Sequence, residues 1–408
     1  MTVASGSDAA PARLPQGEFI ALLAMMFALT AFSIDAMLPA MPEISAELSP
    51  EAPNRAQLII TSFVLGMGLG TFLTGPLSDA FGRRRVIIGG VVLYCVGATL
   101  AWAAPTLELV LAARVLQGLG VAGPRVAAMA LVRDLYSGRQ MARIVSFTMM
   151  IFTLVPAVAP LLGSFIIAGF GWRGIFPAFI VFATVATTWF WARQAETLPV
   201  RARRPLRFDT LRAAVKEILT HKLVLMIIAV MSLAFACLFS VLSSTQQVFD
   251  QRFGLAVTFP HWFAVIALVS GLASVINARL VVRLGMRWMV TATFSYQVVN
   301  SGAMVLLFGI GIVPESLAFW VYLYWTITVF FMAGLTIGNL NALALEPMGH
   351  IAGTAASVVT AVATVLSVIV AAPIGLAFDG TPVPLMGGVF VCVAVALPIM
   401  LRLPRLTD

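Results

Sequence analysis

Twelve long apolar segments follow one another along the chain, and no other feature of the sequence restricts the possible folds so strongly. A run of about 20 mainly apolar residues is long enough to cross a lipid bilayer as a helix. The expected spans lie near residues 19–41, 55–77, 86–104, 107–132, 142–169, 174–192, 222–248, 258–281, 288–312, 316–345, 353–378 and 382–401. We therefore expect an all-α membrane protein with twelve transmembrane helices.

The composition agrees with a chain that is surrounded by lipid. Hydrophobic residues make up 61% of the 408 positions and charged residues only 10%, whereas about a quarter of a soluble protein is charged. Cys95, Cys237 and Cys392 are single residues inside apolar segments, a pattern that predicts neither a disulfide nor a metal site. The sequence has no Walker loop and no catalytic triad, so we expect neither an enzyme nor an ATP-driven pump, and no cofactor.

Basic residues are concentrated in the two terminal segments and in every second loop between the apolar segments. The other loops carry acids such as Glu43, Glu47 and Glu51. Such an asymmetry orients membrane proteins, because loops rich in Lys and Arg stay in the cytoplasm. We therefore expect both termini in the cytoplasm. The net charge of +8 is explained by this orientation, without nucleic acid as a partner.

A longer, Arg-rich segment divides the expected helices into two groups of six. The predicted units are a disordered cytoplasmic tail (1–18), an N-terminal half (19–193), a linker (194–221), a C-terminal half (222–402) and a short tail (403–408). Two six-helix halves indicate a duplicated transporter fold with pseudo-symmetry, whose substrate path lies between the halves. The linker either includes an amphipathic helix on lipid headgroups or is a solvated loop.

The clearest motif is the stretch from Gly75 to Arg85, GPLSDAFGRRR, between the second and third spans. Its glycines allow a sharp turn, and its acid can lie against a helix N-terminus. A weaker copy at Ala278 to Gly285 lacks the acid. We expect the motif to act as a latch that ties this loop to the cytoplasmic side of the other half; the latch residues are Gly75, Asp79, Gly82, Arg83 and Arg84.

Two charged residues lie inside apolar segments, where a charge is costly. Asp35 lies in the first span and Arg114 in the fourth, with Gln117 one turn further. At 1.5 Å per residue, both charges lie about 9 to 10 Å inside the same membrane boundary. The matched depth predicts one proton-coupling site, in which Asp35 carries the proton and Arg114 controls its release. The alternative is a structural ion pair that keeps its charge.

These motifs together resemble those of a known transporter family. The stretch from Gly75 to Arg85 closely resembles the signature loop of the major facilitator superfamily. Arg114-Val-Leu-Gln117-Gly118 looks like the Arg-x-x-Gln-Gly motif of its proton-coupled drug exporters. A third stretch, with Pro156, Pro160 and Gly163, resembles the family's antiporter motif, although Ala159 and Ser164 stand where that motif usually has glycine.

Within this family, the stretch from Asp35 to Pro42 is similar to the Asp-x-Tyr-Leu-Pro segment of the bicyclomycin and chloramphenicol resistance branch, with Met37 in place of tyrosine. Two further stretches, Arg133 to Tyr136 and His350 to Ser357, also resemble segments of this branch. The resemblance implies a monomeric drug:proton antiporter that exports small amphipathic organic molecules across a bacterial inner membrane. A metabolite exporter, a proton symporter that imports a nutrient, and a sensor that does not transport remain alternatives.

Polar and aromatic residues inside the spans are candidate contacts for a small-molecule substrate. Each of the polar ones can also serve to pack helices together, and the aromatic residues near Tyr324 can form an interfacial belt. These candidates are Gln246, Asn300, Tyr324, Trp325 and Asn341. Met37 is a further candidate, because it stands where the resistance branch often has tyrosine.

Overall fold

The computed structural model describes residues 14–203, 206 and 208–404, and within these residues the regular elements are helices. Most of the predicted tails, residues 1–13 and 405–408, lie outside the described residues. The first helix already begins at Gln16, three residues before the predicted span.

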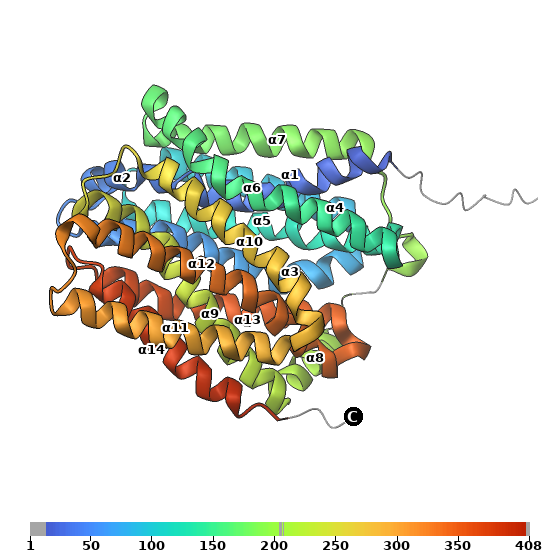
Figure 1. Cartoon of the computed structure of the whole chain (residues 1–408). Helices are drawn as coiled ribbons and strands as arrows, with labels where there is room; N and C mark the ends of the chain where they lie inside the picture. Colours follow the sequence, from blue (N-terminus) through green and yellow to red (C-terminus); the bar gives the residue numbers. More distant parts are fainter. Residues whose placement is uncertain (1–13, 204–205, 207, 405–408) are drawn as a thin grey trace, which may run out of the picture.

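Twelve helices of 19 to 33 residues lie side by side in one bundle (Figure 1). They are α1 (Gln16–Asp35), α3 (Leu58–Phe81), α4 (Arg83–Ala103), α5 (Leu107–Leu135), α6 (Gly138–Phe170), α7 (Ile175–Arg193), α9 (Lys222–Gln247), α10 (Phe259–Leu284), α11 (Met286–Gly309), α12 (Glu315–Leu345), α13 (Ala352–Leu376) and α14 (Val383–Leu401). Each coincides with one expected span. The prediction of an all-α protein with twelve long helices is confirmed.

Short elements connect the long helices. They are η1 (Leu38–Ala40), α2 (Met41–Leu48), η2 (Pro53–Gln57), η3 (Trp172–Gly174), η4 (Val200–Ala202), α8 (Phe208–Thr220), η5 (Val248–Arg252) and η6 (Glu346–Ile351). By length and apolar composition, ten stretches of the described chain are able to cross a membrane, and one of them, Glu315–Leu376, contains both α12 and α13.

Two glycines fix equivalent turns in the two parts of the chain. Gly82 separates α3 from α4 with φ 97°, and Gly285 separates α10 from α11 with φ 81°. Residues with a side chain rarely adopt such values, so glycine is needed at both turns. The weak sequence repeat between residues 75–82 and 278–285 thus corresponds to a repeated turn.

Two pairs of helices join the N-terminal half (α1–α7) to the C-terminal half (α9–α14). In the first pair, α3 packs along α13, and a Cβ on Gly68 would lie 3.1 Å from Thr364 Cγ2. In the second pair, α6 packs on α10, and a Cβ on Gly271 would lie 2.8 Å from Thr153 Cγ2. Small residues therefore allow the helices of the two halves to approach closely, as in other membrane bundles.

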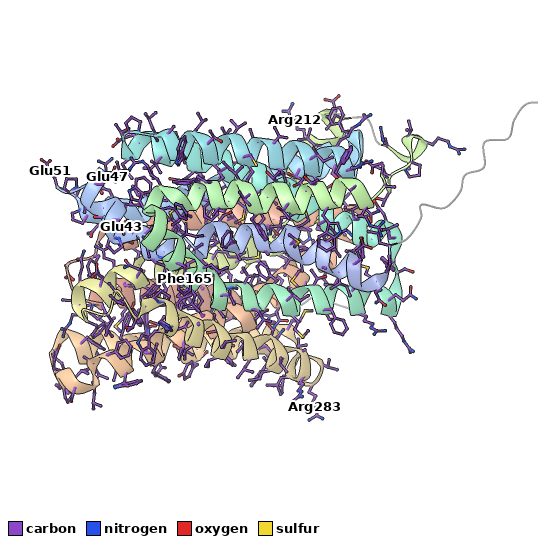
Figure 2. The ribbon with its side chains drawn as sticks, turned by 90° about the horizontal axis from the view of Figure 1, so that it is seen from above. Glu43, Glu47, Glu51, Phe165, Arg212 and Arg283 are labelled. Atoms are coloured by element: carbon purple, nitrogen blue, oxygen red, sulfur yellow. The ribbon has the colours of Figure 1, made fainter. Side chains whose placement is uncertain are left out.

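The bundle has two ends of different charge, which we call the α2 end and the α8 end after the short helices that lie there (Figure 1). Figure 2 shows Glu43, Glu47 and Glu51 at the α2 end, with Arg212 and Arg283 toward the opposite end. The loops therefore show in space the charge asymmetry that the sequence indicated.

The linker contains a short helix, α8, with one buried and one exposed side. Ile218 of α8 is fully buried, while Arg212 and Lys216 on the same helix are exposed. The helix packs on α9 and α13. It therefore attaches the linker to the C-terminal half.

Candidate functional site

Arg114 is fully buried on α5, and groups from four other residues surround its guanidinium. Its Nη2 donates to the Ser33 carbonyl at 2.9 Å, and its Nη1 donates to Gln117 Oε1 at 2.6 Å. Nε points to the Ile59 carbonyl at 3.4 Å, and the Phe63 ring lies 4.3 Å from Cζ. The predicted closeness of Arg114 and Gln117 is therefore found in the structure. The charge is stabilised by neutral groups.

Tyr94 of α4 completes this cluster. Its hydroxyl is 2.6 Å from Ser33 Oγ, which in turn donates to the Leu29 carbonyl. Tyr94 and Ser33 are both fully buried. Neither residue was predicted from the sequence, since a single Tyr or Ser in an apolar span carries no distinctive signal.

Asp35 is the last residue of α1 and retains only 5% of its accessible surface. The helix ends there because Pro39 has no N–H to donate to the Asp35 carbonyl. Among the described residues, no cation lies within 4 Å of its carboxylate and no side chain donates a hydrogen bond to it. The carboxylate is thus buried without a counter-charge.

The alternative for these residues, a structural ion pair between Asp35 and Arg114, is therefore not formed in this structure. Depth along two helices was matched correctly, but depth does not determine the direction in which a side chain points around its helix. Arg114 binds the carbonyl of Ser33, two residues before Asp35. It lies close to the predicted partner in sequence without forming an ion pair.

Glycines of the predicted motifs bring helix backbones close together around this site. A Cβ on Gly163 of α6 would lie 3.0 Å from the Ala36 carbonyl carbon, next to Asp35. A Cβ on Gly118 would lie 2.8 Å from Met67 N, and Gly120 packs equally closely on Tyr94. The motif on α6 therefore contacts the residue next to Asp35, whereas the glycines of the motif on α5 pack on α3 and α4.

The prolines of the antiporter motif lie inside a continuous helix. Pro156 and Pro160 are both within α6, which runs without interruption from Gly138 to Phe170. Proline removes a backbone hydrogen bond and allows a helix to bend. The bend is thus possible one to two turns before the contact of Gly163 with Ala36.

A hydrogen-bond network that sequence analysis did not predict joins the two halves at the α2 end. Gln247 Nε2 donates to Asn54 Oδ1 at 2.7 Å, and Gln57 Nε2 donates to Gln247 Oε1. Ser244 Oγ donates to Gln57 Oε1 at 2.7 Å. We call these four side chains the amide network.

Backbone carbonyls extend the amide network. Asn54 Nδ2 donates to the carbonyls of Phe378 at 2.7 Å and Leu376 at 3.0 Å. Hydrogen bonds between described residues of the two halves all lie at this end. The only sequence signal was the pair Gln246 and Gln247 near the end of one apolar span.

The signature loop forms ion pairs inside the N-terminal half. Arg83 donates to Asp79 at 2.5 Å and to Asp134 of α5 at 3.0 Å. The carboxylate of Glu196 accepts from the backbone N–H groups of Arg83 and Arg84 at the start of α4. Such a carboxylate complements the positive end of the helix dipole.

The predicted latch to the other half is not formed by these charges in this structure. Asp79 has a half-exposed side chain, and its carboxylate accepts a hydrogen bond from Arg83. Gly75 is the latch residue that meets the other half, since a Cβ there would lie 3.0 Å from Ser357 Oγ of α13. Gly82 supplies the turn between α3 and α4.

Three predicted substrate contacts are occupied by neighbouring groups of the protein. Met37 is fully buried in the core. Trp325 is also fully buried, and its Nε1 donates to Ser301 Oγ at 3.0 Å. Asn300 Nδ2 donates to Thr328 Oγ1 at 2.9 Å. In this conformation these side chains pack the helices.

The other three candidates lie in different environments. Tyr324 is 47% exposed and hydrogen bonds to the exposed Tyr296 of α11, so in this conformation it lies apart from the buried Trp325. Gln246 is 98% buried beside the amide network. Asn341 has a buried Oδ1 without a hydrogen-bond partner.

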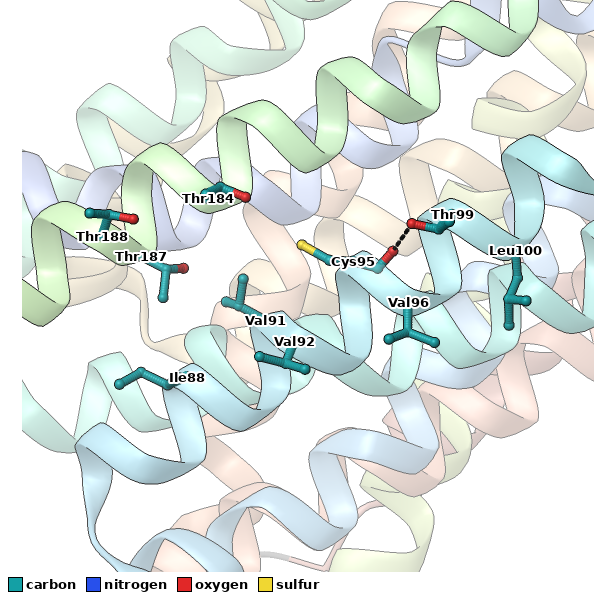
Figure 3. A pocket seen from close by; sticks show the side chains of 10 residues that line it. All are labelled: Ile88, Val91, Val92, Cys95, Val96, Thr99, Leu100, Thr184, Thr187 and Thr188. Atoms are coloured by element: carbon teal, nitrogen blue, oxygen red, sulfur yellow. Dashed lines mark hydrogen bonds between the residues drawn. The ribbon is translucent and has the colours of Figure 1, made fainter.

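A groove of about 480 Å³ lies between α4 and α7, away from all of these residues (Figure 3). Its lining is mainly apolar, with Cys95 and the threonines Thr99, Thr184, Thr187 and Thr188. Val92, Val96 and Leu100 at its wall are exposed on the outside of the bundle. The groove is therefore a feature of the outer surface.

No group of three His, Cys, Asp or Glu side chains suited to a metal ion is found in the described part of the chain.

Comparison with known proteins connects this architecture to a family of membrane transporters. The family model described as "Major Facilitator Superfamily" matches residues 23–372. The chain is 28% identical over 384 residues to a bicyclomycin resistance protein homolog of Haemophilus influenzae, covering 93% of this chain and 94% of the relative. It is 36% identical over 177 residues to a chloramphenicol resistance protein of Pseudomonas aeruginosa, covering 42% of each.

A solved structure has a similar fold. The crystal structure of a D-xylose-proton symporter matches with a TM-score of 0.76 at 14% identity, covering 96% of this chain and 98% of the other.

Proposed function

Because this chain belongs to the major facilitator superfamily and is a multi-pass membrane transporter of small molecules, we propose that it is a drug:proton antiporter. It exports small amphipathic organic molecules from a bacterial cytoplasm in exchange for protons. Support for export comes from relatives named for resistance to bicyclomycin and chloramphenicol. Support for proton coupling comes from the site around Asp35.

The observation that carries the proposal is the isolated carboxylate of Asp35. A charge buried at membrane depth without a partner is costly. Asp35 also lies at the C-terminal, negative end of α1, where a negative charge is further disfavoured. Binding of a proton neutralises the carboxylate and removes both costs. A conformational change that exposes Asp35 to water therefore favours release of this proton, and burial favours its uptake.

Arg114 acts on Asp35 through the backbone in this proposal. Its guanidinium holds the Ser33 carbonyl in the last turn of α1, and Gln117 holds the guanidinium. A rearrangement of α1 that exposes Asp35 to the charge would favour the ionised carboxylate. Arg114 is then a positioning residue whose distance from Asp35 depends on the conformation.

Orientation completes the scheme. The charge asymmetry of the loops supports a cytoplasmic α8 end and a periplasmic α2 end, with both termini in the cytoplasm. The amide network then closes the periplasmic end. Protonation of Asp35 from the periplasm accompanies substrate release there, and proton loss to the cytoplasm restores substrate binding.

The test is drug accumulation in efflux-deficient cells, with and without a protonophore. Cells with the wild-type protein should exclude chloramphenicol, and the protonophore should abolish exclusion. Asp35→Asn mimics the protonated carboxyl, so this variant should insert normally and lose exclusion. Asp209→Asn, on the exposed side of α8, is the matched control and should behave as wild type.

Other outcomes would identify the alternatives. Uptake that a protonophore abolishes would indicate a symporter. Binding without movement of the ligand would indicate a sensor. Protonophore-sensitive export by the Asp35→Asn protein would exclude Asp35 as the coupling residue.

A further inference from the structure

The C-terminal half contains a second buried polar cluster, formed by α11 and α12. Gln297 Nε2 and Trp325 Nε1 both donate to Ser301 Oγ, at 2.9 and 3.0 Å. Tyr322 packs against Trp325 with ring centroids 6.0 Å apart, and Thr326 follows on the same side of α12. All five side chains are fully buried. We call them the α11–α12 cluster.

This cluster occupies positions that match the site around Arg114. Gln297 lies as many residues after the first residue of α11 as Tyr94 lies after the first residue of α4. Each of these two helices follows a glycine with positive φ. The two residues therefore stand at the same height in equivalent helices.

The same correspondence holds for α5 and α12. Tyr322 and Arg114 are equally far from the first residues of their helices, Glu315 and Leu107. Trp325 and Gln117 each follow three residues later. The two clusters are thus pseudo-symmetric counterparts, one in each half.

Their charge differs. The N-terminal cluster contains a guanidinium and lies near Asp35, whereas the α11–α12 cluster has only neutral groups. The acids between residues 222 and 402 are at the ends of helices: Asp250, Glu315, Glu346 and Asp379. The C-terminal half therefore offers no carboxylate to a cation at this depth.

Three buried polar atoms in the α11–α12 cluster form no hydrogen bond of normal geometry: Gln297 Oε1, Tyr322 Oη and Thr326 Oγ1. The Tyr322 hydroxyl lies near the hydroxyls of Thr245 and Thr326 without such a bond to either. Buried polar atoms without a partner destabilise a folded protein, so natural structures contain few of them. Their concentration within neighbouring turns of two helices indicates that a partner binds there in another conformation.

The covering residues belong to the segment that includes the amide network. Thr245 of α9 lies beside the Tyr322 hydroxyl and between Ser244 and Gln247 of that network. Phe249 and Phe253, which follow α9, place their rings 6.0 and 5.6 Å from the Tyr322 ring. Breaking the amide network would release the end of α9 and give access to the cluster.

We propose that the α11–α12 cluster is the part of the substrate site that binds an uncharged polar group, a hydroxyl or a secondary amide. Gln297 Oε1 can only accept a hydrogen bond, whereas the Tyr322 and Thr326 hydroxyls can donate one. A substrate hydroxyl can donate to Gln297 and accept from Tyr322 or Thr326, and a secondary amide can do the same through its N–H and its C=O. A quaternary cation satisfies neither. This inference depends on the proposed export function and specifies its substrate.

Binding to the purified protein tests the inference with two probes. Chloramphenicol is uncharged and carries hydroxyls and an amide, while tetraphenylphosphonium is a cation without hydrogen-bonding groups. Wild type should bind chloramphenicol more tightly. Tyr322→Phe and Thr326→Val should each weaken chloramphenicol binding about three- to tenfold, as expected for one lost hydrogen bond.

Thermal unfolding separates a binding role from a structural one. Tyr322→Phe removes a buried hydroxyl that forms no hydrogen bond of normal geometry, so without drug the variant should unfold at the same or a higher temperature. A structural role would lower that temperature. Tyr324→Phe, which removes a hydroxyl from the outer face of the same helix, is the control and should retain wild-type affinity.

Each contrary result overturns the inference. Unchanged chloramphenicol affinity in both Tyr322→Phe and Thr326→Val would do so. The inference also fails if the wild-type protein binds tetraphenylphosphonium but not chloramphenicol, or if it binds neither probe. Failure of the export proposal is seen separately, as chloramphenicol accumulation in cells that does not respond to a protonophore.

Discussion

The two ends of the bundle use different chemistry for their polar contacts. At the α2 end, neutral amides and a hydroxyl join the N-terminal half to the C-terminal half through Asn54, Gln57 and Gln247. At the α8 end, the ion pairs of Arg83 with Asp79 and Asp134 stay within the N-terminal half. Neutral groups connect the two halves at the α2 end, whereas the ion pairs described at the α8 end do not cross from the N-terminal half to the C-terminal half.

This difference indicates how the two ends can alternate. Neutral hydrogen bonds contribute little net free energy each, about 0.5 to 1.5 kcal/mol, so the amide network can open without separating charges. The half-exposed Asp79 remains available for a contact across the halves when the α8 end closes. The proposed transport cycle therefore exchanges a neutral contact at one end for a charged one at the other.

A covalent link across the α2 end should have the largest effect. In a variant without native cysteines, Asn54→Cys with Phe378→Cys places thiols on both sides of the amide network. A reducible thiol cross-linker should then remove the open state and lower transport at least about tenfold, with recovery after reduction. Drug efflux from cells or proteoliposomes measures this.

The matched control is a link inside one half at the same end. Glu47 and Arg173 form an ion pair within the N-terminal half, so Glu47→Cys with Arg173→Cys should tolerate the cross-linker. Full transport by the cross-linked 54–378 protein would show that the α2 end does not need to open.

The next largest effect is expected at Asp79. Asp79→Ala removes the acid that we expect to reach the other half, so turnover should fall about tenfold, equivalent to about 1.4 kcal/mol, while drug affinity in detergent stays unchanged. Proteoliposome efflux and equilibrium binding measure the two quantities. Asp209→Ala, an exposed acid on α8, controls for loss of charge at this end. Wild-type turnover in Asp79→Ala would contradict the latch.

A smaller effect is expected from weakening the amide network. Gln57→Leu removes hydrogen bonds to Gln247 and Ser244 while keeping the volume similar. The population open at the α2 end should rise about three- to tenfold, as the loss of one or two such bonds implies. Distances between spin labels at that end report this population. Gln140→Leu, on the exposed start of α6, should leave it unchanged.

The sequence predicted the helices more fully than the contacts between them. Apolar length is a property of one segment, so all twelve long helices and the turn at Gly82 were found in advance. The closeness of Arg114 and Gln117 was also predicted correctly, because residues three positions apart on a helix share a face. The resemblance to known motifs indicated the family before any comparison.

Contacts across helices were harder to predict because they depend on rotation as well as depth. Asp35 and Arg114 matched in depth but form no ion pair. Tyr324 was selected with Trp325, yet neighbouring residues on a helix point in different directions, and only Trp325 is buried. Asn54 and Gln57 lie in the short η2 element before α3, where polar residues are common and carry no signal.

The smallest expected effect is a difference in salt dependence between the two ends. The Debye length falls from about 10 Å at 0.1 M salt to about 3 Å at 1 M, so partly exposed ion pairs weaken over this range. The side chain of Asp79 is 47% exposed, whereas Gln57 is 4% exposed and neutral. Spin-label distances at the α8 end should therefore shift by less than about twofold in population, and those at the α2 end should not shift. Asp79→Ala should reduce the response at the α8 end, because it removes the more exposed of the two carboxylates that pair with Arg83. An equal response at both ends would show that the neutral and charged contacts do not work separately.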